Sequence, residues 1–369
     1  MSKNIDCNTT TIAPLDSLRH VKSTPSISAK LKVNFDDFKV KEYLGFEPTG
    51  SGDHLFIKLK KINLSTIEVV RKLSETTGAR LSTIGYSGMK DKRGECTQWF
   101  SIPLKSKIET AVSSLENKQL KIISSQLNIR KLKIGNHKEN HFSIKLRDCQ
   151  GDKYEFEDRL NKLMEHGVPN YFGMQRFGKK MQNVQKMMKL MEETQQVLDS
   201  KISQLLRNET RAKRGILISA ARAYLFNQLL SKRIQLKNWS RYQPGDVLNL
   251  DGTDAYFLVP DDQWDETLQQ RLNFFDIHIS GPLAGHIFSQ NKYITRSKAA
   301  DIENDSMENS SSILKGLKKL DVSASRRPLR FRPKNLQWSW QGENILNVRF
   351  SLRRGCYATS LLREVCLTD

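Results

Sequence analysis

Two kinds of apolar spacing divide this chain into segments that must fold differently. Apolar residues alternate with polar ones along residues 35–43 and 55–59, and again in the later segment ILNVRFSLRRG, which is the period of a half-buried β-strand. Between them, apolar residues recur mainly at helical spacing, most clearly in SAARAYLFNQLLSKRI. The first part predicts an α/β or α+β domain. The order sheet, helices, sheet predicts that a helix-rich domain is inserted into it.

Local signals predict several individual elements. Ser65 is followed three residues later by Glu68, a capping box that predicts a helix ending at Gly78. A final helix is predicted in ATSLLREVCL. The polar, turn-rich stretch AADIENDSMENSSS predicts an exposed loop. Further strands are predicted in five segments: QLKIISSQL, RKLKIG, HFSIKLRD, DVLNLDG and AYFLVP.

The length of the chain, 369 residues, exceeds the usual size of one compact domain, so two domains are expected. Residues 1–27 are rich in Ser, Thr and Lys without a sustained period, and we predict a flexible arm there. The sheet-forming domain is predicted to comprise residues 28–160 and 337–369, which would rejoin in one sheet. The inserted helix-rich domain is predicted at residues 161–336.

The charge balance indicates what the protein binds. Sixty Lys and Arg against forty Asp and Glu leave a formal net charge of +20, which attracts polyanions such as RNA or anionic lipid surfaces. No segment has the apolar length needed to cross a bilayer, and the N-terminus lacks the apolar core of a signal peptide. We therefore expect a soluble, cytoplasmic protein.

Cysteine, histidine and glycine patterns predict neither a metal nor a cofactor. The five cysteines are scattered without a CxxC pair, as expected of reduced thiols. His137 and His141 lie four residues apart in HKENH, but the segment is not the HExxH of zinc enzymes. Walker-type phosphate loops, GxGxxG fingerprints and GxSxG elbows are absent as well.

The segment GYSGMKDKRGECTQWF carries the clearest candidate for a catalytic side chain, Asp91. Its glycines allow unusual backbone angles. Lys90, Lys92 and Arg93 would favour the ionised carboxylate, which can act as a nucleophile or a general base. Taken alone, the segment is more typical of a solvated surface loop. The neighbouring cations also need not reach the carboxylate, because adjacent side chains on an extended segment point apart.

Aromatic residues stand among cations at two further places. Tyr171, Phe172, Arg176 and Phe177 occur in GVPNYFGMQRFGKK, and Tyr357 follows an Arg-Arg-Gly sequence closely. Aromatic faces stack on unpaired bases while Lys and Arg bind phosphates, so this composition predicts RNA recognition. Packing in the core is the alternative for each ring.

Several segments, in order over nearly the whole chain after the N-terminal arm, resemble the TruD family of tRNA pseudouridine synthases. The most specific are GYSGMKDKRGECTQWFSIP and GVPNYFGMQRFG, with LKVNFDDFKVKEYLGFEP, RKLKIGNHKENHFSIKLRD, SAARAYLFNQLLSKRI, HISGPLAG and FSLRRGCYATSLLREV beside them. The resemblance implies an α+β fold, with a pseudouridine-synthase-like mixed or antiparallel sheet in the catalytic domain and an inserted family-specific domain. It also implies conversion of a uridine in tRNA, expected at position 13, to pseudouridine without cofactor or metal.

The resemblance further implies roles for individual residues. The family's catalytic aspartate falls on Asp91, which is expected to attack the target uridine at the base or the sugar, so that the base detaches, turns and rejoins through carbon. Lys32 matches a basic residue close to the active site. Phe38, Asn140 and Tyr357 match positions that contact the target uridine; at the last of these the more familiar residue is Phe.

Three more residues are expected to support the site or to contact RNA: Lys90, Arg176 and Phe177. The latter two match the motif that opens the family's inserted domain. The expected partner is tRNA, with no obligate protein partner and a monomeric state. The N-terminal arm and a polar segment around 302–312 depart from the family pattern, which leaves RNA contacts there open.

Two other interpretations stay open at this point. A non-catalytic RNA-binding or RNA-remodelling protein could keep the same fold, although the presence of Asp91, Lys32 and Asn140 together argues against it. A peripheral membrane protein would need a basic amphipathic helix or a lipidation motif. The start MSKN and the end CLTD match neither a myristoylation nor a prenylation signal.

Overall fold

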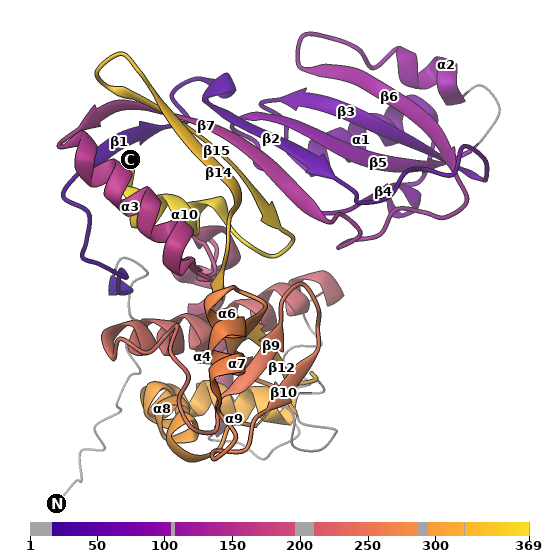
Figure 1. Cartoon of the computed structure of the whole chain (residues 1–369). Coiled ribbons are helices and arrows are strands. Elements are labelled where there is room, and N and C mark those ends of the chain that lie inside the picture. The colour runs from indigo at the N-terminus through magenta and orange to yellow at the C-terminus, as the bar shows by residue number, and fades with distance from the viewer. Residues whose placement is uncertain (1–16, 105–107, 196–209, 287–293, 321, 369) are drawn as a thin grey trace, which may run out of the picture. The chain divides into compact units, whose positions relative to one another are not determined.

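The computed structural model describes residues 17–104, 108–195, 210–286, 294–320 and 322–368 (Figure 1). The chain divides into two compact units, which we call the sheet unit and the helical unit. The sheet unit comprises Pro25–Met164, Pro333–Ala358 and the chain from Val365 onward. The helical unit comprises the chain up to Thr24, Glu165–Arg332 and Thr359–Glu364. No helix in the described ranges is both long enough and apolar enough to span a bilayer.

Two parts of this division differ from the predicted boundaries. Leu18 and Ile27 are only 5% and 1% exposed, so the described end of the expected flexible arm is packed. Residues 359–364, expected in the sheet domain, group with the helical unit. There Arg363 donates to the backbone oxygen of Leu18 at 2.8 Å. Isolated apolar residues such as Leu18 show no period, which is why the pattern alone did not reveal their burial.

The sheet unit is built on one ten-stranded mixed sheet, whose main path is β14-β15-β7-β2-β5-β3-β6, with β1, β16 and β4 at its margins. β2 and β5 are parallel, as are β1 and β16, and the other pairs are antiparallel. The predicted mixed or antiparallel sheet is thereby confirmed. The strands are β1 (Ser28–Leu31), β2 (Phe38–Tyr43), β3 (His54–Ile62), β4 (Gly85–Tyr86), β5 (Glu95–Pro103), β6 (Leu120–Asn128), β7 (Glu139–Gln150), β14 (Lys334–Gln341), β15 (Ile345–Arg353) and β16 (Leu367–Thr368).

Helix α1 (Thr66–Thr77) covers one face of this sheet and lies behind β3 and β5 in Figure 1. The predicted capping box is confirmed, because Ser65 accepts the Glu68 backbone N–H, and the helix ends at Gly78 with φ 67°. Val69 and Leu73 are completely buried, which anchors the start of α1 near the sheet. The same unit holds α2 (Ile108–Ser113), α3 (Lys153–His166), η2 (Phe35–Asp37) and η3 (Leu81–Thr83).

The other face of the sheet carries a row of lysines. Lys41 pairs with Thr97, and Thr97 pairs with Lys60, so these side chains point to the same side. Lys39 and Lys58 lie two residues away on the same strands and therefore share that face. The sheet thus separates an apolar, helix-covered side from a basic side.

One predicted strand, RKLKIG, is wrong, because residues 130–135 form no strand. The backbone N–H of Leu132 donates to the side-chain hydroxyl of Ser101 at 3.0 Å instead of to a neighbouring strand. Leu132 is buried in a small cluster with Leu44, Phe56 and Trp99. The short alternation of Lys and apolar residues therefore came from the burial of Leu132 in a loop and not from a strand.

The helical unit packs helices around two small sheets, β10-β9-β11-β12 and β13-β8. Its strands are β8 (Val168–Pro169), β9 (Val247–Leu250), β10 (Tyr256–Leu258), β11 (Ile277–Leu283), β12 (Ser325–Pro328) and β13 (Arg330–Phe331). Its helices are α4 (Gln182–Gln195), α6 (Arg211–Gln235), α7 (Glu266–Asn273), α8 (Ser297–Met307), α9 (Ser311–Lys319) and most of α10 (Ala358–Val365), with η4 (Met174–Arg176), η5 (Lys179–Met181) and η6 (Glu308–Ser310).

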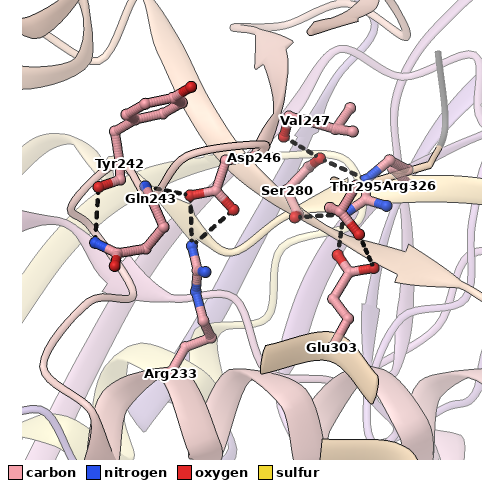
Figure 2. A network of polar contacts seen from close by, with 9 residues as sticks. All are labelled: Arg233, Tyr242, Gln243, Asp246, Val247, Ser280, Thr295, Glu303 and Arg326. Carbon is pink, nitrogen blue, oxygen red and sulfur yellow. Dashed lines mark hydrogen bonds and ion pairs between the residues drawn. The ribbon is translucent and has the colours of Figure 1, made fainter. Parts of the chain in front are cut away.

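The exposed loop predicted over AADIENDSMENSSS is wrong, because this stretch forms α8, η6 and the start of α9. Ala299 and Ile302 of α8 are buried, three residues apart as one helical face requires. Glu303 of α8 contacts Arg326, whose Nε also donates to Ser280 Oγ at 2.8 Å. Figure 2 shows this network, which explains why so polar a segment is ordered.

A second buried pair lies in the same view. Arg233 of α6 donates to both carboxylate oxygens of Asp246 at 3.0 and 2.8 Å, and each side chain is 2% exposed (Figure 2). Asp246 also accepts the Gln243 backbone N–H at 2.8 Å. The pair therefore ties α6 to the turn before β9.

Candidate active site

The loop that carries Asp91 is held by buried side chains of its own unit. It connects β4 and β5. Gln98 of β5 donates to the Gly88 backbone oxygen at 2.6 Å. Thr66, the first residue of α1, accepts the Lys90 backbone N–H at 2.9 Å and donates to Gln98 at 3.0 Å. A glycine-rich segment is therefore fixed by hydrogen bonds to the sheet and the helix.

A buried lysine holds the next residue of the loop. Lys61, at the end of β3, is 0% exposed. Its Nζ donates to the backbone oxygens of Leu64 at 2.5 Å and Asp91 at 2.8 Å. Burial lowers the pKa of this ammonium, although the charge of Asp91 opposes the shift. Lys61 thus holds the Asp91 backbone through its carbonyl oxygen.

The carboxylate of Asp91 lies beside Lys32. Lys32 Nζ is 3.6 Å from Asp91 Oδ2, with the two side chains 19% and 24% exposed. The same ammonium lies 4.0 Å above the centre of the Phe38 ring. Lys32 has φ 59°, in the left-handed region that costs an L-residue about 1–2 kcal/mol. The surrounding structure therefore holds a strained residue next to the carboxylate.

The three cations that adjoin Asp91 in sequence each have a partner elsewhere in the sheet unit. Their partners are Glu42 for Lys90 at 2.7 Å, Glu68 for Lys92 at 2.8 Å, and the Val33 backbone oxygen for Arg93 at 3.5 Å. Successive side chains of an extended segment point apart. The cation that the structure places beside Asp91 comes from Lys32, far earlier in the chain.

Lys90 belongs to a second, more deeply buried group. Its Nζ lies 2.7 Å from Glu42 Oε2 in an ion pair that lacks hydrogen-bond alignment at this oxygen. It donates to Asn140 Oδ1 at 2.7 Å. Glu42 Oε1 accepts the Trp99 backbone N–H at 3.1 Å. Because an ammonium only donates hydrogen bonds, Lys90 fixes the Asn140 amide with its oxygen toward Lys90.

This orientation determines the protonation of His137. Asn140 Nδ2 lies 3.2 Å from His137 Nε2, so Nε2 must accept and the ring proton must be on Nδ1. His137 Nδ1 contacts Ser87 Oγ, which also accepts the His137 backbone N–H at 2.9 Å. Burial and the charge of Lys90 lower the pKa of His137 to about 4. At neutral pH a neutral histidine therefore holds the Asn140 amide.

The remaining predicted residues of the sheet unit lie around this site. Phe38 is 1% exposed, so its ring is covered in this structure, in part by the Lys32 ammonium. Tyr357 is half-buried in the turn after β15. That turn follows the end of β15 that lies beside Asn140 at the start of β7, because Leu352 pairs with Asn140. The structure brings Asp91, Lys32 and Phe38 together, and Asn140 joins them through Lys90, the residue before Asp91.

Arg176 and Phe177 belong to the helical unit. Phe177 is completely buried and packs in the core of its unit, so its expected role of supporting the site or contacting RNA stays a prediction. Arg176 donates to Ser219 Oγ at 3.0 Å, and its guanidinium lies 5.7 Å from the Phe172 ring centre. Tyr171 is buried as well, and its hydroxyl donates to the Arg19 backbone oxygen at 2.9 Å.

Sequence reasoning missed six residues of the site: Glu42, Lys61, Thr66, Ser87, Gln98 and His137. Two of them carried a readable signal. Glu42 continues the inward register of Phe38, and Lys61 continues that of Leu59. A charged residue in a core-facing register is costly unless it is paired, so it marks a constrained site.

Among the residues that the structure describes, no group of three or more His, Cys, Asp or Glu is arranged to hold a metal ion. The sequence profile of the family described as "TruD: tRNA pseudouridine synthase D (TruD)" matches residues 15–214 and 185–365. The chain belongs to the TruD family of tRNA pseudouridine synthases. The ordered GYSGMKDKRG and VPNYFGMQRFG segments are thus those of a family member.

Relatives within the family are similar over almost their whole length. The tRNA pseudouridine synthase D of Nitrosococcus oceani is 37% identical over 94% of this chain and 92% of its own. That of Methylococcus capsulatus is 32% identical over 96% and 95%. The crystal structure of a putative tRNA pseudouridine synthase D from Methanosarcina mazei has a TM-score of 0.71 at 20% identity, covering 94% of this chain and 95% of that one. This last likeness concerns the fold.

Proposed function

We propose that this chain isomerises a uridine in tRNA to pseudouridine, with Asp91 as the nucleophile and position 13 as the expected target. The observation that carries the proposal is the Asp91 carboxylate, held on a fixed backbone with the Lys32 ammonium 3.6 Å away. Such a carboxylate is the group that this reaction needs. Membership of the TruD family supports the substrate class.

In the proposed reaction Asp91 attacks the base or the sugar of an extruded uridine. The bond between N1 and the sugar carbon breaks, the base turns, and the bond from C5 to the same carbon forms. The bond that Asp91 formed to the substrate breaks, which regenerates the carboxylate. The C5 proton leaves and N1 gains a proton, so the product is an isomer of the substrate. This balance needs no redox partner or group donor, and no cofactor is proposed.

The other predicted residues take binding roles in this proposal. Asn140, whose amide orientation is fixed by Lys90, presents a defined edge to the uracil. Tyr357 offers a half-buried ring in the turn after β15. Phe38 contributes its ring after Lys32 moves toward the carboxylate or the RNA. Arg176 remains a proposed RNA contact from the helical unit, and the protein is proposed to act in the cytoplasm as a monomer.

The test compares two aspartates of the sheet unit that each pair with a lysine. Asp91 pairs with Lys32 at 3.6 Å, and Asp148 pairs with Lys30 at 2.9 Å. Asp91→Asn should reduce pseudouridine formation in tRNA to background while binding stays within a few-fold of the parent protein. Asp148→Asn should leave both unchanged. Undiminished product from Asp91→Ala would rule out the nucleophile and favour an RNA-binding protein without this chemistry.

A further inference from the structure

A cavity of about 490 Å³ opens beside the reacting pair on the sheet unit. Its walls are residues 33–36, the end of β3 at Ile62, and Arg93 with Glu95. Nothing in the proposed reaction uses it. Its place in the chain is distinctive, because one wall follows Lys32 directly and the other begins two residues after Asp91.

Chain geometry keeps this cavity close to the reaction. Consecutive Cα atoms are 3.8 Å apart, so the Cα of Arg93 lies within about 7.6 Å of that of Asp91. The Arg93 guanidinium donates to the Val33 backbone oxygen at 3.5 Å and so joins the two walls. A neighbouring nucleotide of an RNA strand that presents its uridine to Asp91 is therefore within reach of this cavity.

The wall at residues 33–36 is built on a buried ion pair and is preorganised. Asp37 is 0% exposed and accepts two hydrogen bonds from Arg147 Nε, at 3.0 and 2.9 Å. The same carboxylate accepts the Asn34 backbone N–H at 2.7 Å. The segment that presents residues 33–36 is thus fixed at its C-terminal end, which lowers the ordering cost of binding a ligand.

The chemistry of the walls suits an unpaired nucleotide. Val33 and Phe35 are 44% and 42% exposed, which is apolar surface that a base can cover. Arg93 is an exposed cation at the rim. The carboxylate of Glu95 is paired with Lys60 at 2.8 Å, which reduces its repulsion of a phosphate. Aromatic rings that stack on bases beside cations that bind phosphates are the usual means of holding single-stranded RNA.

The cavity also continues into the basic side of the sheet. Glu95 pairs with Lys39 and with Ile62, so the floor of the cavity and the lysine row lie on one face. A polyanion that leaves the cavity in this direction meets Lys39, Lys41 and Lys60. The charge of the surface therefore favours an RNA strand over a neutral ligand.

We propose that this cavity binds the nucleotide next to the target uridine, with its base against Phe35 and a phosphate at Arg93. This inference rests on the proposed function and adds a second recognition point to it. It explains how an enzyme that extrudes one base can hold the strand beside it. The occupant is the nucleotide on one side of the target uridine, either the one before it or the one after it in the RNA strand.

The experiment is a double-mutant cycle that combines one substitution in the protein with one change in the RNA. The parent protein and Phe35→Ala are assayed on a tRNA transcript and on two versions that lack the base on either side of the target. Phe35→Ala should raise KM on the intact transcript, on the order of 5- to 100-fold for one lost stacking contact, with kcat retained. On one of the two abasic transcripts, the parent and Phe35→Ala should have the same KM.

The control is Phe46→Ala, because Phe46 is also 42% exposed and lies in the same unit. It should raise KM equally, or not at all, on all three transcripts. A Phe35→Ala penalty of equal size on intact and both abasic transcripts would overturn the proposal. So would an unchanged KM on the intact transcript.

Binding measurements separate this proposal from the proposed function. The same cycle is run as binding affinity with Asp91→Asn, which forms no product in either case. If the parent protein forms no pseudouridine but the binding cycle shows coupling at Phe35, the proposed reaction fails and the cavity assignment stands. Arg93→Gln should flatten the salt dependence of binding by about one phosphate contact. An unchanged slope would remove the phosphate from the assignment.

Discussion

The ammonium of Lys90 lies 2.7 Å from the carboxylate of Glu42, and only 6% of the first side chain and none of the second is exposed to solvent. Burying two charges is costly unless further hydrogen bonds satisfy them. Here Asn140 and the Trp99 backbone supply those bonds. The pair therefore fixes the position of Lys90, the residue directly before Asp91 in the chain.

Two adjacent lysines allow a matched test of this pair. Lys90→Met should lower the free energy of unfolding by about 3–5 kcal/mol, because it leaves the buried Glu42 carboxylate without its partner. Lys92→Met removes a pair of similar length, with Glu68 at 2.8 Å, but those side chains are 55% and 35% exposed. It should cost less than about 1 kcal/mol. Denaturant unfolding measures both, and equal losses would contradict the assigned burial.

Lys61 is predicted to act on the reaction through the position of Asp91. Lys61→Met keeps the length of the side chain but leaves the backbone oxygens of Leu64 and Asp91 without their donor. A small displacement of the carboxylate should lower kcat on the order of 10- to 100-fold with KM little changed. Lys58→Met, on the opposite face of the same strand, is the control. A fall in thermal stability with kcat intact would reduce Lys61 to a structural role.

His137 is predicted to make the stability of the protein depend on pH below neutrality. Its pKa is about 4 in the folded protein against an ordinary value of 6.5, so the unfolded chain takes up the proton first as pH falls. The contribution of this residue to stability is complete above pH 6.5 and is lost as the pH falls toward 4. The protonated ring would also turn a donor toward Asn140 Nδ2.

Urea unfolding at several pH values measures this dependence. The difference between the parent protein and His137→Leu should be constant above pH 6.5 and should shrink as pH falls to 4.5. Leu is chosen because it fills much of the ring volume without titrating. A difference that stays constant over the whole range would show that His137 titrates normally or that its neighbours compensate.

The substitution Lys32→Gly is predicted to lower the activity without lowering the stability of the protein. Lys32→Gly removes the ammonium beside Asp91 but relieves a φ of 59°, which glycine adopts without strain. The reaction should slow by roughly 10-fold or more, because the reacting carboxylate loses the cation beside it. The free energy of unfolding should stay level or rise by up to about 1 kcal/mol.

The control for this change is Lys237→Gly, at φ 56° in the helical unit. It should stabilise to a similar extent without any effect on product formation. If Lys32→Gly destabilised the protein by several kcal/mol, the packing of Lys32 over Phe38 would outweigh its backbone strain, and the activity loss could not be assigned to the charge.

Much of the fold was predictable because it depends on local patterns. The capping box at Ser65 and the alternation through β2, β3 and β15 correspond to elements of the structure. The misassigned stretches were those whose burial depends on distant partners. Residues 299–312 looked like a loop, yet they form helices, and Glu303 of α8 is held by Arg326 from another part of the chain. The polar composition of a segment does not reveal a partner that lies far away in the sequence.

Asp91 itself was visible in the sequence through its family motif, and so were the alternating strands around it. What only the tertiary structure decided is which cation stands beside it. The lysines and arginine next to Asp91 in the chain reach Glu42, Glu68 and Val33, while Lys32 reaches the carboxylate. The reason is geometric: side-chain direction alternates along an extended backbone, so proximity is set by strand pairing and not by adjacency in sequence.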